Sequence, residues 1–197
     1  MTSVRPATLH DANSLVDLAE SVGREEGRWI LGSGPWRSAS DERRYLRSIQ
    51  RYPDAAVFVA EDGERIVGRL SLSRDPHPAS RHVADLGLMV AASHRRQGVG
   101  TALLDVAVGW ARESGVRKLE LHVFPWNEPA LALYGSFGFE REGYRKRHYE
   151  RGDELVDAIL MAYFLEDASD GCATPWPLWR TGSIGSRPLT STTSSPG

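Results

Sequence analysis

The stretch VAASHRRQGVGTALL, residues 90–104, decides how this chain folds. An apolar strand ends at Val90, a basic turn with Gly98 and Gly100 follows, and an amphipathic helix begins at once. Glycine lets the backbone turn tightly and lie close to a ligand, because no Cβ stands in the way. The first-turn amides of the helix, from Val99 to Ala102, are unpaired donors at the positive end of the helix dipole. The segment therefore predicts an anion site suited to a pyrophosphate.

The chain on both sides of this loop alternates between strand and helix periodicity. Helices are predicted after an N-cap at Asp11, from Ser40 to about Gln50, from Gly98 to about Ser114 and from Glu128 to Phe137. Strands are predicted at residues 4–7, 56–60, 65–73, 82–90, 118–123, 139–149 and 155–164. The central strand–helix–strand unit requires a right-handed parallel crossover, whereas the flanking hairpins require antiparallel pairs. These elements predict an α/β fold, a mixed and mostly antiparallel sheet with helices on both faces.

Two common phosphate-binding motifs do not match the loop. Gly98-Val99-Gly100 lacks the third glycine of G-x-G-x-x-G, and the loop lacks the G-K-[ST] ending of a P-loop. Residues 95–100 instead read R-x-x-G-x-G, which resembles the pyrophosphate loop of the GNAT superfamily of N-acetyltransferases. A second segment, NEPALALYGSFGF at residues 127–139, is similar to the N-x-x-A-x-x-x-Y…G-F signature of that family.

The resemblance covers roughly residues 3–165 in the element order of the family. It implies the GNAT acyl-CoA N-acyltransferase fold, in which the sheet is splayed at the central β-α-β crossover and opens a V-shaped cleft. It also implies an enzyme that uses acetyl-CoA as its acyl donor. No metal is expected, because His10, His82 and His122 show no metal-ligand grouping.

The resemblance also implies which residues hold the cosubstrate. The pantetheine arm would pair with the strand end at Leu88, Met89 and Val90, and Asn127 would hydrogen-bond the arm. An N-cap role for Asn127 is the simpler interpretation of the residue alone, and both roles can hold at once. The pyrophosphate loop would comprise Arg95, Arg96, Gln97, Gly98, Val99, Gly100 and Thr101.

Three side chains are candidates for the proton transfers of acetyl transfer. The resemblance implies that Tyr134 is the acid that protonates the departing thiolate, or positions it, and a phenol keeps its proton at neutral pH. Without the motif, Tyr134 would be interpreted as a helix residue packed on Phe137. Asp85 and Glu120, which lie on the two strands that flank the cleft, are the candidates for a base that acts through a water, although a charged residue on a strand is more often solvated or salt-bridged. His122 shares a strand face with Glu120.

The acceptor is expected to be the primary amine of a small molecule such as an amino acid. The segment RGDELVDA at residues 151–158 is similar to the phosphinothricin-type and amino-acid branch of the family, and HVAD at 82–85 looks like an L-amino-acid acetyltransferase. Trp29, Trp36 and above all Trp126 could wall a pocket. Glu25, Glu26 and Glu42 could attract the ammonium group of an acceptor, although each is expected to be solvated. A protein N-terminal or lysine acetyltransferase and a non-catalytic acyl-CoA-binding module stay open as alternatives.

Composition limits the remaining classes. Of the 197 residues 41% are hydrophobic and 25% are charged, and the net charge of −2 argues against a nucleic-acid binder that relies on bulk charge. A single cysteine, Cys172, excludes an internal disulfide. No secretory signal or membrane span is apparent, so a cytoplasmic protein is expected; whether it forms a homodimer stays open. Residues 1–167 are predicted to form the catalytic domain. Residues 168–197 are predicted to be a disordered tail, since 19 of these 30 are Ser, Thr, Gly or Pro.

Overall fold

The computed structural model describes residues 2–30 and 36–165. The predicted tail, with Cys172 and the segment Pro175–Trp179, lies outside the described residues, so its disorder stays a prediction. The strands are β1 (Ser3–Pro6), β2 (Ala55–Asp62), β3 (Arg65–Arg74), β4 (Val83–Val90), β5 (Lys118–Val123), β6 (Glu140–Arg151) and β7 (Glu154–Phe164). Besides short 3-10 helices of three residues each, the described helices are α1 (Ala12–Gly23), α2 (Ala39–Ile49), α3 (Val99–Glu113) and α4 (Glu128–Phe137). None of them is long and apolar enough to cross a membrane.

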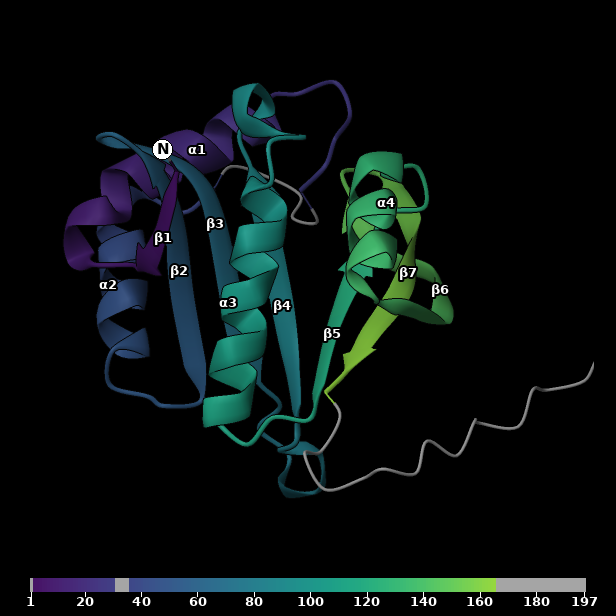
Figure 1. Cartoon of the computed structure of the whole chain (residues 1–197). Helices are drawn as coiled ribbons and strands as arrows, with labels where there is room; N and C mark the ends of the chain where they lie inside the picture. The colour runs from purple at the N-terminus through teal and green to yellow at the C-terminus, as the bar shows by residue number, and fades with distance from the viewer. Residues whose placement is uncertain (1, 31–35, 166–197) are drawn as a thin grey trace, which may run out of the picture. The chain divides into compact units, whose positions relative to one another are not determined.

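The strands form one seven-stranded sheet in the order β1-β2-β3-β4-β5-β7-β6. Within it, β4 and β5 are parallel, and the other neighbouring strands are antiparallel. The parallel pairing covers three positions, Val83 with Lys118, Ala84 with Leu119 and Asp85 with Glu120. Beyond Asp85 the strands diverge, and Figure 1 shows them adjacent at one end and apart at the other. The predicted splayed sheet is confirmed, and the β4 edge from Leu86 to Val90 faces the opening.

Helices cover both faces of the sheet, as the sequence predicts. On one face, Leu15 of α1 and Leu46 of α2 pack with Val57 and Val59 of β2. On the other face, α3 packs against the sheet and α4 lies along β5 and β7 (Figure 1). The alternation of β3 follows from this division, since Leu70 and Leu72 belong to the α3 core and their neighbours point to the α1/α2 face.

Two helix starts differ from the sequence prediction. Asp11 precedes α1 but does not cap it with its side chain. Its carboxylate instead accepts hydrogen bonds from the Thr8 amide at 2.7 Å and from the Arg5 guanidinium at 2.8 and 2.9 Å. Helix α2 begins before the predicted Ser40-Asp41 cap, because the Ser38 hydroxyl accepts a hydrogen bond from the Asp41 amide at 3.2 Å.

Candidate functional site

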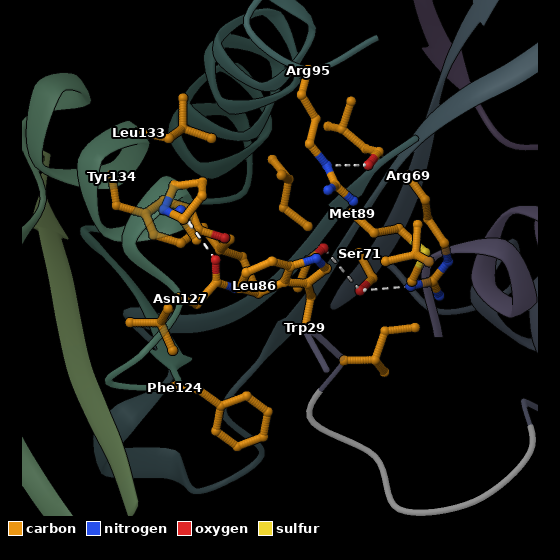
Figure 2. A pocket seen from close by; sticks show the side chains of 18 of the residues that line it. Trp29, Arg69, Ser71, Leu86, Met89, Arg95, Phe124, Asn127, Leu133 and Tyr134 are labelled. Carbon is orange, nitrogen blue, oxygen red and sulfur yellow. Dashed lines mark hydrogen bonds between the residues drawn. The ribbon is translucent and has the colours of Figure 1, made fainter. Parts of the chain in front are cut away.

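A cavity of about 770 Å³ reaches the end of β4 and the neighbouring residues of β5. One part of its wall consists of the α3 start and α4, and another consists of β3 and residues near α1 and α2. Figure 2 shows Leu133, Tyr134 and Asn127 on one side of this cavity and Arg69, Ser71 and Met89 on the other. The cavity therefore joins the predicted cosubstrate cleft to the α1/α2 face of the sheet.

The two glycines of the predicted phosphate loop serve different structural needs. Gly98 has a φ of 82°, a left-handed conformation that a side chain disfavours, and it directly precedes α3. Gly100 lies inside the first turn, and a Cβ there would come within 2.7 Å of Leu133 Cδ2 on α4. The Ala102 amide, predicted to be free, donates to the Gly98 carbonyl at 2.9 Å, so the free amides of the turn end at Thr101.

Arg95 is half-buried and is held by hydrogen bonds to other parts of the protein. Its guanidinium makes two hydrogen bonds of 2.7 Å to the two carboxylate oxygens of Glu25, just after α1. Its Nε donates to the Val90 carbonyl at 3.0 Å, as Figure 2 shows. Glu25 Oε2 also accepts a hydrogen bond from Trp29 Nε1 at 2.7 Å. Arg95 therefore ties the predicted phosphate loop to the wall of the cavity near α1.

Most residues that the sequence assigns to the cosubstrate line this one cavity. They are Leu88, Met89, Val90, Arg95, Arg96, Gly98, Thr101, Asn127 and Tyr134. The other three, Gln97, Val99 and Gly100, are not among the lining residues. Gln97 Nε2 donates to the Ser93 carbonyl at 2.8 Å, and Val99 is buried in the core. These three therefore shape the loop, and the backbone amides of Val99 and Gly100 belong to the free first turn of α3.

Helix α4 positions both Asn127 and Tyr134. Asn127 precedes the helix, and its Oδ1 accepts a hydrogen bond from the Ala130 amide at 3.2 Å, so the N-cap interpretation is confirmed. That oxygen serves the helix, and Nδ2 is the group that Asn127 can offer to a ligand. Tyr134 is 6% exposed and its ring lies 5.5 Å from that of Phe139. Burial raises the pKa of Tyr134, so its phenol is protonated throughout the neutral range.

The predicted bases lie together on the α1/α2 face of the sheet. Asp85 and Glu120 are register partners, and burial and the charge of Glu120 both raise the pKa of Asp85. Neither carboxylate is among the residues that line the cavity, whereas His122, two residues along β5, is. His122 Nδ1 lies 2.6 Å from the Tyr149 hydroxyl, and its buried Nε2 has no hydrogen-bond partner among the described residues. Burial, Arg145 and His148 lower the pKa of His122, against the opposing effect of Glu120.

The wall near α2 differs from the sequence expectation. Trp29 and Trp36 line the cavity, but Trp126 does not; it stacks on Phe124 at 4.5 Å, and Phe124 is the lining residue. Glu42, expected to be solvated, is completely buried. It lies 3.3 Å from Arg37 Nε and 4.0 Å from Arg69 Nη2.

Arg37 and Arg69 line the cavity, and no sequence pattern indicated either residue. Arg69 occupies a position of β3 that alternation alone cannot distinguish from a solvated one. In the same described part of the chain, no group of three or more His, Cys, Asp or Glu side chains could hold a metal ion.

Comparison with known proteins agrees with this geometry. The family described as "Acetyltransferase (GNAT) family" matches residues 21–139. The chain is 38% identical over 105 residues to L-amino acid N-acetyltransferase AaaT of Escherichia coli K12, a match that covers 51% of this chain and 62% of that relative. It is 28% identical over 137 residues to human N-acetyltransferase 8, with 66% and 60% covered. The chain thus spans less than two thirds of the length of these curated relatives.

Solved structures share the fold. A GNAT acetyltransferase from Streptococcus pneumoniae superimposes with a TM-score of 0.74 at 25% identity, covering 84% of this chain and 100% of that one. A phosphinothricin acetyltransferase from Sinorhizobium meliloti, solved with acetyl-CoA, superimposes with a TM-score of 0.72 at 22% identity, with 83% and 88% covered. Because the family match extends over more than half of its length, this chain belongs to the GNAT family of acetyltransferases.

Proposed function

We propose that this protein transfers an acetyl group from acetyl-CoA to the primary amine of a small molecule such as an amino acid. The observation that carries the proposal is the single cavity that joins the phosphate loop, the open β4 edge and Tyr134 to the α1/α2 face. The amino-acid substrate of the 38% identical E. coli relative supports the choice of acceptor.

The cosubstrate would be held mainly by backbone groups. The amides of Val99, Gly100 and Thr101 and the exposed Arg96 suit a pyrophosphate. The β4 edge beyond Asp85 has lost its β5 partner and can pair with the amides of the pantetheine arm. Apolar side chains such as Leu88, Val90 and Leu133 keep water from the thioester.

The reaction is direct attack of the neutral amine on the thioester carbon in a ternary complex. A carbon–nitrogen bond forms and the carbon–sulfur bond breaks. Tyr134 donates its proton to the departing thiolate, and its buried position keeps that proton available at neutral pH. A backbone amide near Val90 stabilises the oxyanion of the tetrahedral intermediate.

The amine must lose a proton, and His122 is our choice of acceptor for it. Of the three side chains Asp85, Glu120 and His122, His122 is the one that lines the cavity. Its lowered pKa favours the neutral imidazole. In the tautomer whose Nδ1–H donates to the Tyr149 hydroxyl, Nε2 is the atom that can accept a proton. Asp85 and Glu120 lie beyond it on the same sheet face and could receive the proton through water.

The test is release of the CoA thiol from acetyl-CoA with free amino acids, polyamines, aminoglycosides and peptides. Turnover with free amino acids supports the proposal. Turnover with peptides alone would replace it by acetylation of a protein amine; a relative from E. coli that is 39% identical over 75 residues is named [Ribosomal protein bS18]-alanine N-acetyltransferase. Binding of acetyl-CoA without turnover of any amine would identify a non-catalytic module.

A further inference from the structure

The charged side chains that line the described cavity are all arginines. They are Arg37, Arg69, Arg95 and Arg96, and no aspartate or glutamate of the described residues joins them. Arg95 and Arg96 belong to the phosphate loop, where an anionic cosubstrate accounts for them. Arg37 and Arg69 lie elsewhere, just before α2 and on β3, and need a different explanation.

We propose that Arg37 and Arg69, with Trp36 and Ser71, form an anion subsite that binds the carboxylate of the amine acceptor. This inference rests on the proposed function and narrows it: the acceptor is an amino acid with a free carboxylate, or a close analogue with another oxyanion in that place. A polyamine or an amine without an acidic group does not fill the subsite.

Arg69 supplies the strongest observation. It is 4% exposed, on the α1/α2 face of β3, opposite the core residues Leu70 and Leu72. Its Nη1 donates to Ser71 Oγ at 3.2 Å, which Figure 2 shows, while its buried Nε has no hydrogen-bond partner among the described residues. A buried guanidinium with an unused donor is costly unless a ligand or water completes it. An oxyanion bound in the cavity would complete it.

The local charge balance also favours an anion. Glu42 is the carboxylate paired with both arginines, at 3.3 Å from Arg37 and 4.0 Å from Arg69, and it does not line the cavity. Two guanidiniums and one carboxylate leave one positive charge, which a ligand carboxylate would neutralise. Burial lowers the pKa of Arg69, and the charge of Glu42 opposes this shift without cancelling it. The lowered pKa reflects the free-energy cost of burying a cation that is incompletely paired.

Aromatic rings hold the two guanidiniums in place. The guanidinium carbon of Arg37 lies 4.3 Å from the centroid of the Tyr45 ring, and that of Arg69 lies 5.4 Å from the Trp36 ring. Trp36 Nε1 is a second buried donor without a partner among the described residues. Trp36 and Arg69 thus bring several donors to one wall, as an acceptor-only group such as a carboxylate requires. The Ser71 hydroxyl orients Arg69, since it accepts from the guanidinium and itself donates to the Gly87 carbonyl at 3.4 Å.

The position of the subsite fits an amino acid. Arg69 and Ser71 are the register partners of Met89 and Gly87 on β4, the strand whose free edge faces the cleft. Gly87 lines the cavity and has no side chain, so the sheet surface is open between the subsite on β3 and His122 on β5. A carboxylate on β3 would place the neighbouring amine over β4, close to the acyl donor.

The test compares each of several L-amino acids with its carboxamide and with its decarboxylated amine, in the wild-type protein. For each compound kcat/KM is calculated on the concentration of the neutral amine, because the three differ in amine pKa. We expect kcat/KM to fall at least tenfold when the carboxylate is removed, which is about 1.4 kcal/mol. Equal values for the acid and its amide would overturn the subsite while leaving acetyl transfer intact.

A variant series locates the effect. Arg37→Gln should raise KM for the amino acid about tenfold and lower the ratio of kcat/KM for the acid to kcat/KM for the amide at least tenfold, so that the preference for the acid disappears. Arg69→Lys keeps a positive charge beside the buried Glu42, so that the protein is expected to stay folded. It loses the forked donor geometry of the guanidinium, so the preference for the acid over the amide should disappear here too. Arg44→Gln, on the exposed side of α2, is the matched control and should change neither value. Retained preference in both subsite variants would overturn the assignment.

Calorimetric binding of the amino acid and its amide to the protein saturated with CoA separates the two proposals. If no amine is acetylated, the proposed function fails. A tenfold preference for the acid in this binding measurement would still support the subsite, and equal or absent binding of both would overturn it.

Discussion

Arg95 and Glu25 form a paired ion bridge, with Nη1–Oε2 and Nη2–Oε1 both at 2.7 Å. The two residues are 70 positions apart in sequence, one in the predicted phosphate loop and the other just after α1. Because Glu25 also accepts a hydrogen bond from Trp29, the bridge joins the predicted phosphate loop to the wall of the cavity near α1.

Replacing Glu25 tests this bridge. Glu25→Gln removes the charge that holds Arg95, so we expect acetyl-CoA to bind as tightly as before or up to about tenfold more tightly, while KM for the acceptor rises as Trp29 loses its anchor. Calorimetry with acetyl-CoA and acceptor kinetics measure the two effects. Glu26→Gln, an exposed neighbour, serves as the control. Weaker acetyl-CoA binding in Glu25→Gln would show that the bridge positions Arg95 for the cosubstrate.

Gly98, the residue before α3, and Gly109, inside α3, allow a matched pair of substitutions that tests the loop. Gly98→Ala places a side chain at a φ of 82°, which costs roughly 1 kcal/mol and should weaken acetyl-CoA binding severalfold, whereas Gly98→Val should weaken it at least tenfold. Gly109→Ala makes the same change in the exposed middle of α3, where a Cβ meets nothing within 4 Å, and should raise stability by up to about 1 kcal/mol. Thermal unfolding and acetyl-CoA titration measure both. Unaltered affinity in Gly98→Val would mean that the phosphate site lies elsewhere.

The elements around the loop were predictable because their signals are local. The β5 and α4 boundaries, Lys118–Val123 and Glu128–Phe137, agree with the sequence prediction, since period-two alternation and the Asn127 cap with Pro129 fix them. Helix α2 starts earlier than predicted because three neighbouring polar residues, Ser38, Ser40 and Asp41, offer competing caps.

The wall of the cavity near α2 and the position of the candidate bases were not predictable in the same way. Whether Glu42 is solvated or buried depends on Arg69, which is 27 residues away on β3, and on their meeting across α2 and the sheet. Likewise Asp85, Glu120 and His122 all alternate onto one sheet face, but the divergence of β4 and β5 decides which of them lines the cavity. Such long-range contacts leave no pattern in a single sequence.

Removing one hydroxyl tests the assignment of the acid. Tyr134→Phe keeps the ring that packs near Phe139 and should lower kcat at least tenfold, with little change in acetyl-CoA affinity. Tyr144→Phe, which removes an exposed hydroxyl bonded to Asp157, is the control and should leave kcat unchanged. If Tyr134→Phe turns over at the wild-type rate at every pH, another group protonates the thiolate.

The pH dependence of kcat tests His122. As a base, His122 acts when neutral, so kcat at saturating substrates should rise with pH through its lowered pKa, below the ordinary 6.5. Arg145→Gln removes a positive charge that lowers this pKa and should therefore move the acidic limb to higher pH. His122→Gln should abolish the limb and reduce kcat at least tenfold. A limb that survives in His122→Gln and disappears in Asp85→Asn or Glu120→Gln would assign the base to that carboxylate.

The ion pair of Asp11 with Arg5 makes stability depend on pH at the β1–α1 junction. Its hydrogen bond with Arg5 lowers the pKa of the Asp11 carboxyl to about 2. A lowered folded-state pKa contributes stability above the unfolded value of about 4, and this contribution is lost as the pH falls from 4 toward 2. Because Arg5 is partly exposed and screened by water, we expect Asp11→Asn to lower the free energy of unfolding at pH 7 by roughly 1 to 2 kcal/mol.

Urea unfolding of both proteins at pH 7 and near pH 2.5 measures this contribution. The difference between wild type and Asp11→Asn should shrink markedly at the lower pH, where much of the Asp11 contribution to wild-type stability is gone. Asp17→Asn, on the exposed side of α1, should change the free energy of unfolding by less than about 0.5 kcal/mol at either pH. A difference for Asp11→Asn that is the same at both pH values would show that the substitution acts by disturbing the packing or hydrogen-bond geometry at this junction and not by removing the charge of Asp11.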